Sequence, residues 1–365
     1  LAIDTTPSFV RVSGSCIKRS LPRLLASVGE LLAHPSFPEA ELAQLKRESE
    51  ATLLELMDND QALASMHLRR ALFRGHPYGR PVLGTRASLA RVELEQVVER
   101  YRRELVARPR LFGFAGAITE REAEALVAQH LARAPEHTRH GAAPRVPEPV
   151  MPPGRRLRIV DKPERTQTQI QIGRLGSHPH DDDHVALLVG NAVFGGAFTA
   201  RLMRAVRSER GWSYGASSRL GLDRVREAWS MWTFPAAADA AACIELQLAL
   251  MRDWVERGID ESELGFAKSY LIKSHAFSVD TADKRLEQAV EIALYDLPRD
   301  YYSAFTANVE AVTRDEVNAA LRRRLSPDDL VLAVVATDAE LGPALRAAAR
   351  AESCEVVPFD ADAQE

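Results

Sequence analysis

The feature that most constrains the fold of this chain is an internal repeat, in which two segments match each other 220 positions apart. The first copy covers residues 92–97 and the apolar stretch 111–116, and the second covers 312–317 and 331–336. Each copy has the pattern of an amphipathic helix, a short break and a buried strand. Two copies separated this widely indicate two related domains rather than a solenoid of short repeats.

A proline-rich stretch between the two copies sets the expected domain boundaries. It holds five prolines within residues 142–155, and proline removes backbone donors and favours an extended chain. The length of 365 residues also suits two domains. We therefore predict an N-terminal domain at 1–141, a linker at 142–155 and a C-terminal domain at 156–365.

The order of strand-like and helix-like patterns predicts the α+β class, with two structurally similar domains. The second domain opens with alternating apolar residues at 157–160 and 166–172, and long helical patterns follow. Such a domain packs its helices on one face of a mainly antiparallel sheet. The first domain has the same pattern with its front strands missing. Because a sheet without its first strands leaves edge groups unpaired, we expect the natural chain to continue upstream of Leu1.

Composition and charge argue against two classes of partner. The formal net charge is −4, so the chain lacks the basic surface that nucleic acid requires. The longest apolar run, 185–198, is interrupted by Asn191 and Gly195-Gly196 and falls short of the ~20 residues that span a membrane. The three cysteines form no CxxC pair and no zinc-knuckle spacing. We expect neither nucleic acid nor a membrane as a partner.

Two pairs of closely spaced histidines were considered as metal ligands. His180 and His184 stand four positions apart at a predicted helix start, and His137 and His140 precede the linker. Neither pair has a third ligand in an apolar setting, which a transition-metal site needs. We therefore predict surface and helix-capping histidines at these positions.

The segment 194–214 carries the most specific motif of the chain. It begins with Phe-Gly-Gly-Ala-Phe at 194–198 and ends with Arg207 and Tyr214, seven positions apart across a helix end and into a strand. Gly211 is the expected helix cap between them. Together these features resemble the C-terminal half-site of pitrilysin/insulinase-type metallopeptidases, the family that includes mitochondrial processing peptidase.

The resemblance implies a role for each residue of this half-site. Tyr214 would donate to the carbonyl oxygen of the bond being cut, as an oxyanion-hole element does. Arg207 would hold a neighbouring carbonyl of the substrate, since guanidinium is always charged and has fixed donor geometry. Phe198 would contact substrate. Ala2 and Ile3 correspond to an edge strand to which substrate adds as a further strand.

The zinc ligands of this family come from an inverted HxxEH motif, which this sequence does not contain. In zinc-bearing relatives the third ligand is a glutamate at the position of Glu55, with another seven residues before it, here Glu48. Seven residues is nearly two helical turns, so both carboxylates lie on one side of the predicted helix 38–57. A catalytic zinc needs three protein ligands. We therefore predict no metal in this chain, with Glu55 a ligand only if HxxEH lies upstream.

Three interpretations of function follow from the resemblance. The sequences of 57–64 and 211–218 look like those of bacterial half-length subunits that lack zinc and pair with a zinc-bearing homologue. The first interpretation is therefore a zinc-free subunit of a heterodimeric metallopeptidase, inactive without its partner. The second is a complete zinc peptidase, working as a homodimer, whose HxxEH lies upstream. The third is a non-catalytic scaffold or peptide-binding homologue. Similar bacterial subunits imply a periplasmic location, with a cytoplasmic one as the alternative.

Overall fold

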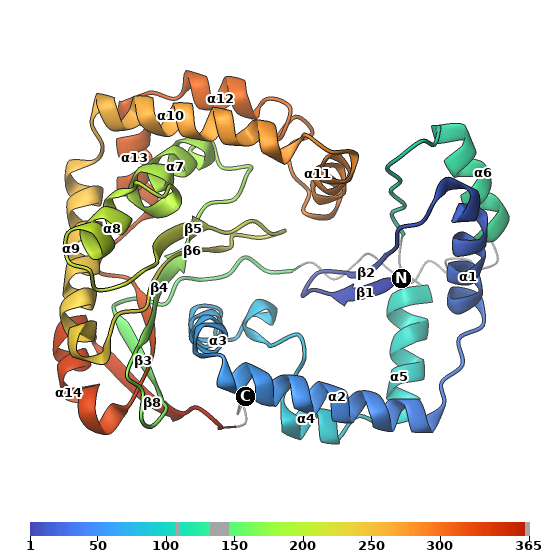
Figure 1. The fold of residues 1–365 in the computed structure, drawn as a ribbon, viewed down its shortest axis with the longest axis horizontal. Helices are drawn as coiled ribbons and strands as arrows, with labels where there is room; N and C mark the ends of the chain where they lie inside the picture. The colour runs from blue at the N-terminus through green and yellow to red at the C-terminus, as the bar shows by residue number, and fades with distance from the viewer. Residues whose placement is uncertain (107–109, 132–145, 362–365) are drawn as a thin grey trace. The chain divides into compact units, whose positions relative to one another are not determined.

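A computed structural model gives the fold of residues 1–106, 110–131 and 146–361 (Figure 1). The chain divides into two compact units, each assembled from segments far apart in the sequence. The first unit comprises Leu1–Leu53, Val82–Val146 and Val279–Leu294, and the second comprises Leu54–Pro81, Pro147–Ser278 and Tyr295–Glu365. The predicted linker 142–155 lies partly outside the described residues, so its boundaries stay a prediction.

The first unit is mainly helical. Its two strands, β1 (Ala2–Thr5) and β2 (Val10–Ser13), form an antiparallel pair. Its helices are α1 (Leu21–Ala33), most of α2 (Glu39–Asp58), α4 (Arg86–Ala90), α5 (Leu94–Arg100), α6 (Glu120–His130) and α11 (Ala282–Leu294). It also contains the short helical turns η1 (Lys18–Ser20) and η3 (Tyr101–Val106), whereas η2 (Pro77–Gly79), η6 (Ala237–Asp239) and η7 (Ala276–Ser278) belong to the second unit.

The second unit contains a six-stranded mixed sheet in the order β5-β6-β4-β7-β3-β8. The first four strands in this order pair antiparallel, whereas β3 pairs parallel with both β7 and β8. The strands are β3 (Arg156–Asp161), β4 (Gln169–Leu175), β5 (Ala216–Leu220), β6 (Ala228–Thr233), β7 (Val331–Ala336) and β8 (Ser353–Pro358). The helices are α3 (Asp60–Leu72), α7 (His184–Asn191), α8 (Arg201–Met203), α9 (Ala240–Arg257), α10 (Glu261–His275), α12 (Phe305–Ala311), α13 (Arg314–Arg324) and α14 (Asp338–Ala349).

The main core of the second unit lies between one face of this sheet and its helices. At its centre are the aromatic rings of Phe194, Trp229 and Trp254, and the first and last of these stack with centroids 4.4 Å apart. The α+β class predicted from the sequence is confirmed. Burying these three rings and the apolar strand residues around them removes a large apolar surface from water.

The helices of residues 156–365 share one core on one face of this sheet, as predicted, and α3 from the N-terminal part of the chain covers the other face. Figure 1 shows α9 and α14 on one side of the sheet and α3 on the other. Leu63 and Ala64 of α3 form a small second core with Val160 and Val335. The sequence pattern missed this packing because α3 lies about 90 residues before the sheet it covers.

Each unit contains one helix from the opposite repeat copy. At the repeat spacing of 220 positions, residues 62–74 correspond to 282–294, so α3 and α11 are equivalent. Nevertheless α3 belongs to the second unit and α11 to the first. Each repeat copy therefore contributes its copy of this helix to the opposite unit.

The repeat predicts its helices correctly and one of its strands wrongly. In α5 the Gln96 side chain accepts from the Glu93 N–H at 2.9 Å, and in α13 Glu316 accepts from the Thr313 N–H at 2.7 Å. These capping contacts sit 220 positions apart. Residues 331–336 form β7, fully buried, but 111–116 form no strand. The neighbours of β7 are β3 and β4, so its strand conformation depends on pairing with distant segments.

One of the described helical runs, His184–Ser208, is long and apolar enough to cross a membrane. Of its most apolar window, 67% is buried within the structure. This burial matches the position of α7 and Phe194 in the main core.

Candidate functional site

The predicted half-site forms on a helical run that is irregular at two places. After α7 comes η4 (Ala192–Gly196), a π-helical turn, and after the short α8 comes a second, η5 (Arg204–Ser208). π-Helical turns are rare and occur often at functional sites. Gly195 is needed at the first turn, because a Cβ there would lie 2.6 Å from the backbone nitrogen of Ser218 in β5.

Arg207 and Phe198 come together on the surface of the second unit. The guanidinium carbon of Arg207 lies 5.1 Å from the centroid of the Phe198 ring, a cation–π arrangement. The Phe198 side chain is 68% exposed, and Arg207 is also exposed. Within the described residues no carboxylate forms a salt bridge with Arg207. The Phe198 ring therefore orients the Arg207 guanidinium group, which remains available to a hydrogen-bond acceptor of another molecule.

Tyr214 is presented by a tightly bonded turn after η5. Gly211 has φ +66°, its N–H donates to Arg207 O at 3.0 Å, and Trp212 N–H donates to Val206 O at 3.1 Å. The predicted glycine cap is confirmed. The chain changes direction at this π-helical end, and Tyr214 beyond it is 81% exposed.

Ser213, which the sequence reading missed, holds the turn that carries Tyr214. Its buried hydroxyl donates to Gly215 O at 2.7 Å and accepts from the N–H of Phe234 at 3.1 Å. These contacts join the turn to the residue that follows β6. No sequence signal separates such a serine from an ordinary surface serine, because both of its partners are backbone atoms.

Asn191 is a second residue whose importance appears only in the structure. Its Oδ1 atom accepts from Ser218 Oγ at 2.7 Å and from Trp229 Nε1 at 2.9 Å. Asn191 thus ties the start of η4 to β5 and β6 inside an apolar core. In the sequence it appeared only as an interruption of an apolar run.

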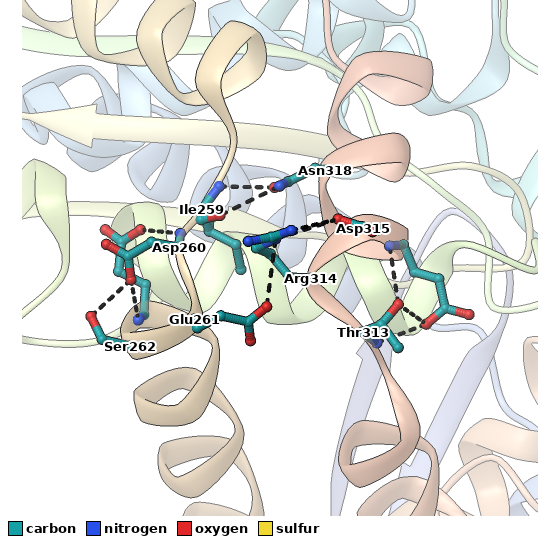
Figure 2. A network of polar contacts seen from close by, with 10 residues as sticks. Ile259, Asp260, Glu261, Ser262, Thr313, Arg314, Asp315 and Asn318 are labelled. Carbon is teal, nitrogen blue, oxygen red and sulfur yellow. Dashed lines mark hydrogen bonds and ion pairs between the residues drawn. The ribbon is translucent and has the colours of Figure 1, made fainter.

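Arg201 anchors the helix that carries Arg207. It forms a bidentate ion pair with Glu263, at 2.5 and 2.6 Å, and donates to Gly258 O at 2.9 Å. Asn318 holds the turn that contains Gly258, because its Oδ1 atom accepts from the Ile259 N–H at 2.8 Å (Figure 2). The start of α8 is therefore clamped to the α9–α10 turn.

The remaining predicted site residues lie elsewhere and make no cluster of metal ligands. Glu48 and Glu55 are exposed on α2, and Glu48 accepts from Gln44 Nε2 at 2.8 Å. Ala2 and Ile3 are exposed in β1 of the first unit. Across the described ranges no group of three histidine, cysteine, aspartate or glutamate side chains is arranged to hold a metal.

The prediction of a surface histidine at 184 was wrong. His184 is 2% exposed, with Ser177 Oγ 2.9 Å from Nδ1 and Tyr301 Oη 2.9 Å from Nε2. Burial lowers its pKa to about 4. His180 is exposed as predicted, while His137 and His140 lie outside the described residues. Tyr301 comes from a distant segment, which explains why spacing alone did not reveal the burial of His184.

Comparison with known proteins agrees with the fold. Residues 95–271 match the family described as peptidase M16 inactive domain. The non-peptidase homolog YmxG of Helicobacter pylori is 20% identical over 336 residues, 92% of this chain and 77% of that protein. An uncharacterized zinc protease of Mycobacterium bovis is 27% identical over 269 residues, 74% of this chain and 61% of that protein. The chain therefore spans less than two thirds of the mycobacterial relative.

A solved structure with a similar fold is the peptidase M16 inactive domain from Pseudomonas fluorescens. It has a TM-score of 0.74 and 24% identity, and the match covers 92% of this chain and 75% of that one. Fold and motif together define an M16-like α+β protein. Residues 95–271 are similar to a peptidase M16 inactive domain, and the resemblance of the chain to the pitrilysin/insulinase-type family is confirmed.

Proposed function

We propose that this chain is the zinc-free subunit of a heterodimeric metallopeptidase, in which Arg207 and Tyr214 bind peptide and stabilise the oxyanion. The observation that carries the proposal is the presentation of these two side chains. Both are exposed, and each lies on a backbone segment held by buried hydrogen bonds or ion pairs. A preorganised donor costs little reorganisation when charge develops on the substrate, which is the basis of oxyanion stabilisation.

In this proposal each residue of the half-site has a separate task. The Tyr214 phenol donates a hydrogen bond to the oxygen on which negative charge accumulates. The Arg207 guanidinium grips a neighbouring peptide carbonyl, with its plane oriented by Phe198. Phe198 offers an exposed apolar face to a substrate side chain. The zinc of the partner subunit supplies an activated water for attack on the peptide bond.

The names of two relatives favour different alternatives. The Helicobacter relative is named a non-peptidase homolog and matches 92% of this chain, which supports a non-catalytic peptide-binding role. The mycobacterial relative is named a zinc protease, which supports a complete peptidase with HxxEH upstream of Leu1. The heterodimer remains our proposal because residues 57–64 and 211–218, which include Tyr214, look like those of bacterial zinc-free subunits. A periplasmic location is part of the same proposal.

The decisive experiment measures peptide turnover by this chain alone, by a homologous zinc-bearing subunit alone and by their mixture. We expect turnover only in the mixture, and Tyr214→Phe should reduce it by about 10- to 1000-fold, as loss of one oxyanion donor does. Tyr302→Phe removes a phenol hydroxyl away from the half-site and should leave turnover unchanged. Full turnover by the Tyr214→Phe mixture would reject the catalytic role. Zinc-dependent turnover by the natural full-length chain alone would favour the complete peptidase.

A further inference from the structure

The second unit has a polar pocket that the proposed half-site does not use. It has a volume of about 320 Å³ and lies between α3 and the face of β4, β5 and β6 that points away from the main core. Volumes near ~300 Å³ are at the lower end for ligand pockets. The pocket therefore suits a short segment or side chain rather than a large cofactor.

An ion pair forms a fixed part of the pocket wall. Both carboxylate oxygens of Glu227 accept from Arg69 Nη1, at 2.9 and 2.8 Å, and Arg69 Nε donates to Tyr78 O at 2.9 Å. The Arg69 guanidinium also lies over the Phe73 ring at 4.9 Å. With these partners the Arg69 charge is neutralised and held in place. Arg69 is therefore not available as a cation for a ligand in the pocket.

The donors that face the pocket without a partner come from two neighbouring strands. Arg219 of β5 stands opposite Ser230 of β6, and Ser217 stands opposite Trp232. Within the described residues no carboxylate pairs with Arg219, and neither serine hydroxyl makes a hydrogen bond. Trp232 is fixed by donating from Nε1 to Gln169 Oε1 at 2.8 Å and by stacking on Phe234. One free guanidinium and two free hydroxyls thus share a wall with a rigid indole ring.

The balance of charge in the pocket selects the kind of anion. Arg69 and Glu227 cancel, so Arg219 leaves a net charge of one positive unit. A guanidinium and hydroxyls suit either a carboxylate or a phosphate. The Glu227 carboxylate lines the same pocket and would repel the second charge of a phosphate. The pocket therefore favours a monoanion.

We infer that this pocket binds a peptide carboxylate, with Arg219 as its charged contact and Ser217 and Ser230 as neutral donors. The carboxylate belongs either to a peptide C-terminus or to an aspartate or glutamate side chain. Arg219 follows Tyr214 by five residues, so the two lie within about 17 Å of each other along an extended chain. Use of the pocket as a substrate subsite rests on the proposed function, whereas carboxylate binding itself does not.

The test measures binding by calorimetry with the whole chain and no zinc, so its outcome is independent of peptidase activity. The probes are acetylated pentaalanine with a free C-terminus, its amide, and amides with one central aspartate or one central asparagine. We expect the free-acid peptide, the aspartate peptide, or both to bind at least tenfold more tightly than their neutral counterparts. Which of the two binds identifies the source of the carboxylate.

Two exposed arginines provide the matched variants. Arg219→Gln should weaken carboxylate binding at least tenfold, and Arg224→Gln, in the β5–β6 connection and outside the pocket, should leave it unchanged. Equal binding by Arg219→Gln and the native chain overturns the inference. So does equal binding of charged and neutral peptides, the absence of binding, or tighter binding of inorganic phosphate than of either carboxylate peptide.

Discussion

Tyr214 is exposed because its neighbour Ser213 is buried and bonded on both sides. The motif in the sequence identified the phenol and the guanidinium, since residue type and spacing carry that signal. It did not identify Ser213 or Asn191, because their roles depend on backbone atoms and side chains from β5 and β6. At the residue scale, sequence therefore predicted the groups that face solvent and missed those that orient them.

Ser213→Ala should destabilise the second unit. The substitution leaves the N–H of Phe234 and the carbonyl of Gly215 without their side-chain partner, and an unsatisfied buried group costs about 1–3 kcal/mol. Urea denaturation should show a loss of roughly 1–2 kcal/mol in the free energy of unfolding. The control is Ser217→Ala, an exposed serine in the next strand, which should change stability by less than about 0.5 kcal/mol. Equal stability of the two variants would show that the Ser213 contacts are not structural.

The helical run from α7 to η5 shows what periodicity can and cannot predict. The helix predicted at 38–57 is observed as α2, with bounds that differ by one residue at each end. The helix that the motif predicts before Gly211 consists of α8 followed by the π-turn η5. Extra residues in π-turns do not alter composition, so the pattern could not reveal them.

The start of α7 should make stability depend on pH. Burial lowers the pKa of His184 to about 4, below its ordinary value of 6.5. The folded state thus binds fewer protons than the unfolded state between these values, and its stability is complete above pH 6.5 and falls toward pH 4. From pH 7 to pH 5 this histidine alone should cost about 2 kcal/mol. Chemical denaturation at several pH values measures the slope.

Two variants separate this histidine from other titrating groups. His184→Gln should reduce the slope of unfolding free energy against pH between 6.5 and 5, whatever its effect on stability at pH 7. His180→Gln, at an exposed histidine of the same segment, should keep the native slope. Burial lowers the pKa of His67 to about 3, so His67 also contributes to the slope of unfolding free energy against pH. Both variants retain that contribution. An unchanged slope in His184→Gln would rule out its buried neutral state.

The exchange of α3 and α11 is the property of the whole molecule that the sequence did not reveal. The repeat located equivalent helices, but equivalence in sequence says nothing about which sheet each helix covers. That choice depends on long-range contacts, such as Lys162 Nζ donating to Asp60 Oδ1 and to Met57 O, both at 2.7 Å. Lys162 is buried, so these oxygens are needed to satisfy its charge.

The exchange predicts that the C-terminal repeat copy is less stable by itself than within the whole chain. A fragment of residues 156–365 lacks α3, whose Leu63, Leu68 and Leu72 are buried in the intact chain. Burial of three leucines contributes about 5 kcal/mol or more, and Lys162 would also lose its partners. We expect the midpoint of thermal unfolding to fall by at least about 10 °C relative to the second unit in the whole chain.

A synthetic peptide of residues 54–81 should restore much of that loss when it is added to the fragment, because it supplies α3, Asp60 and the Met57 carbonyl together. The matched control is the same peptide with Leu63→Asp, which places a charge at a buried position of the second core and should give no recovery. Circular dichroism measures both melting curves. A fragment that melts like the intact chain without the peptide would mean that α3 is an accessory to this sheet. Recovery with the native peptide but not with the Leu63→Asp peptide would show that α3 is part of the folding unit of this sheet. A domain boundary at residues 141–156 would then divide that folding unit.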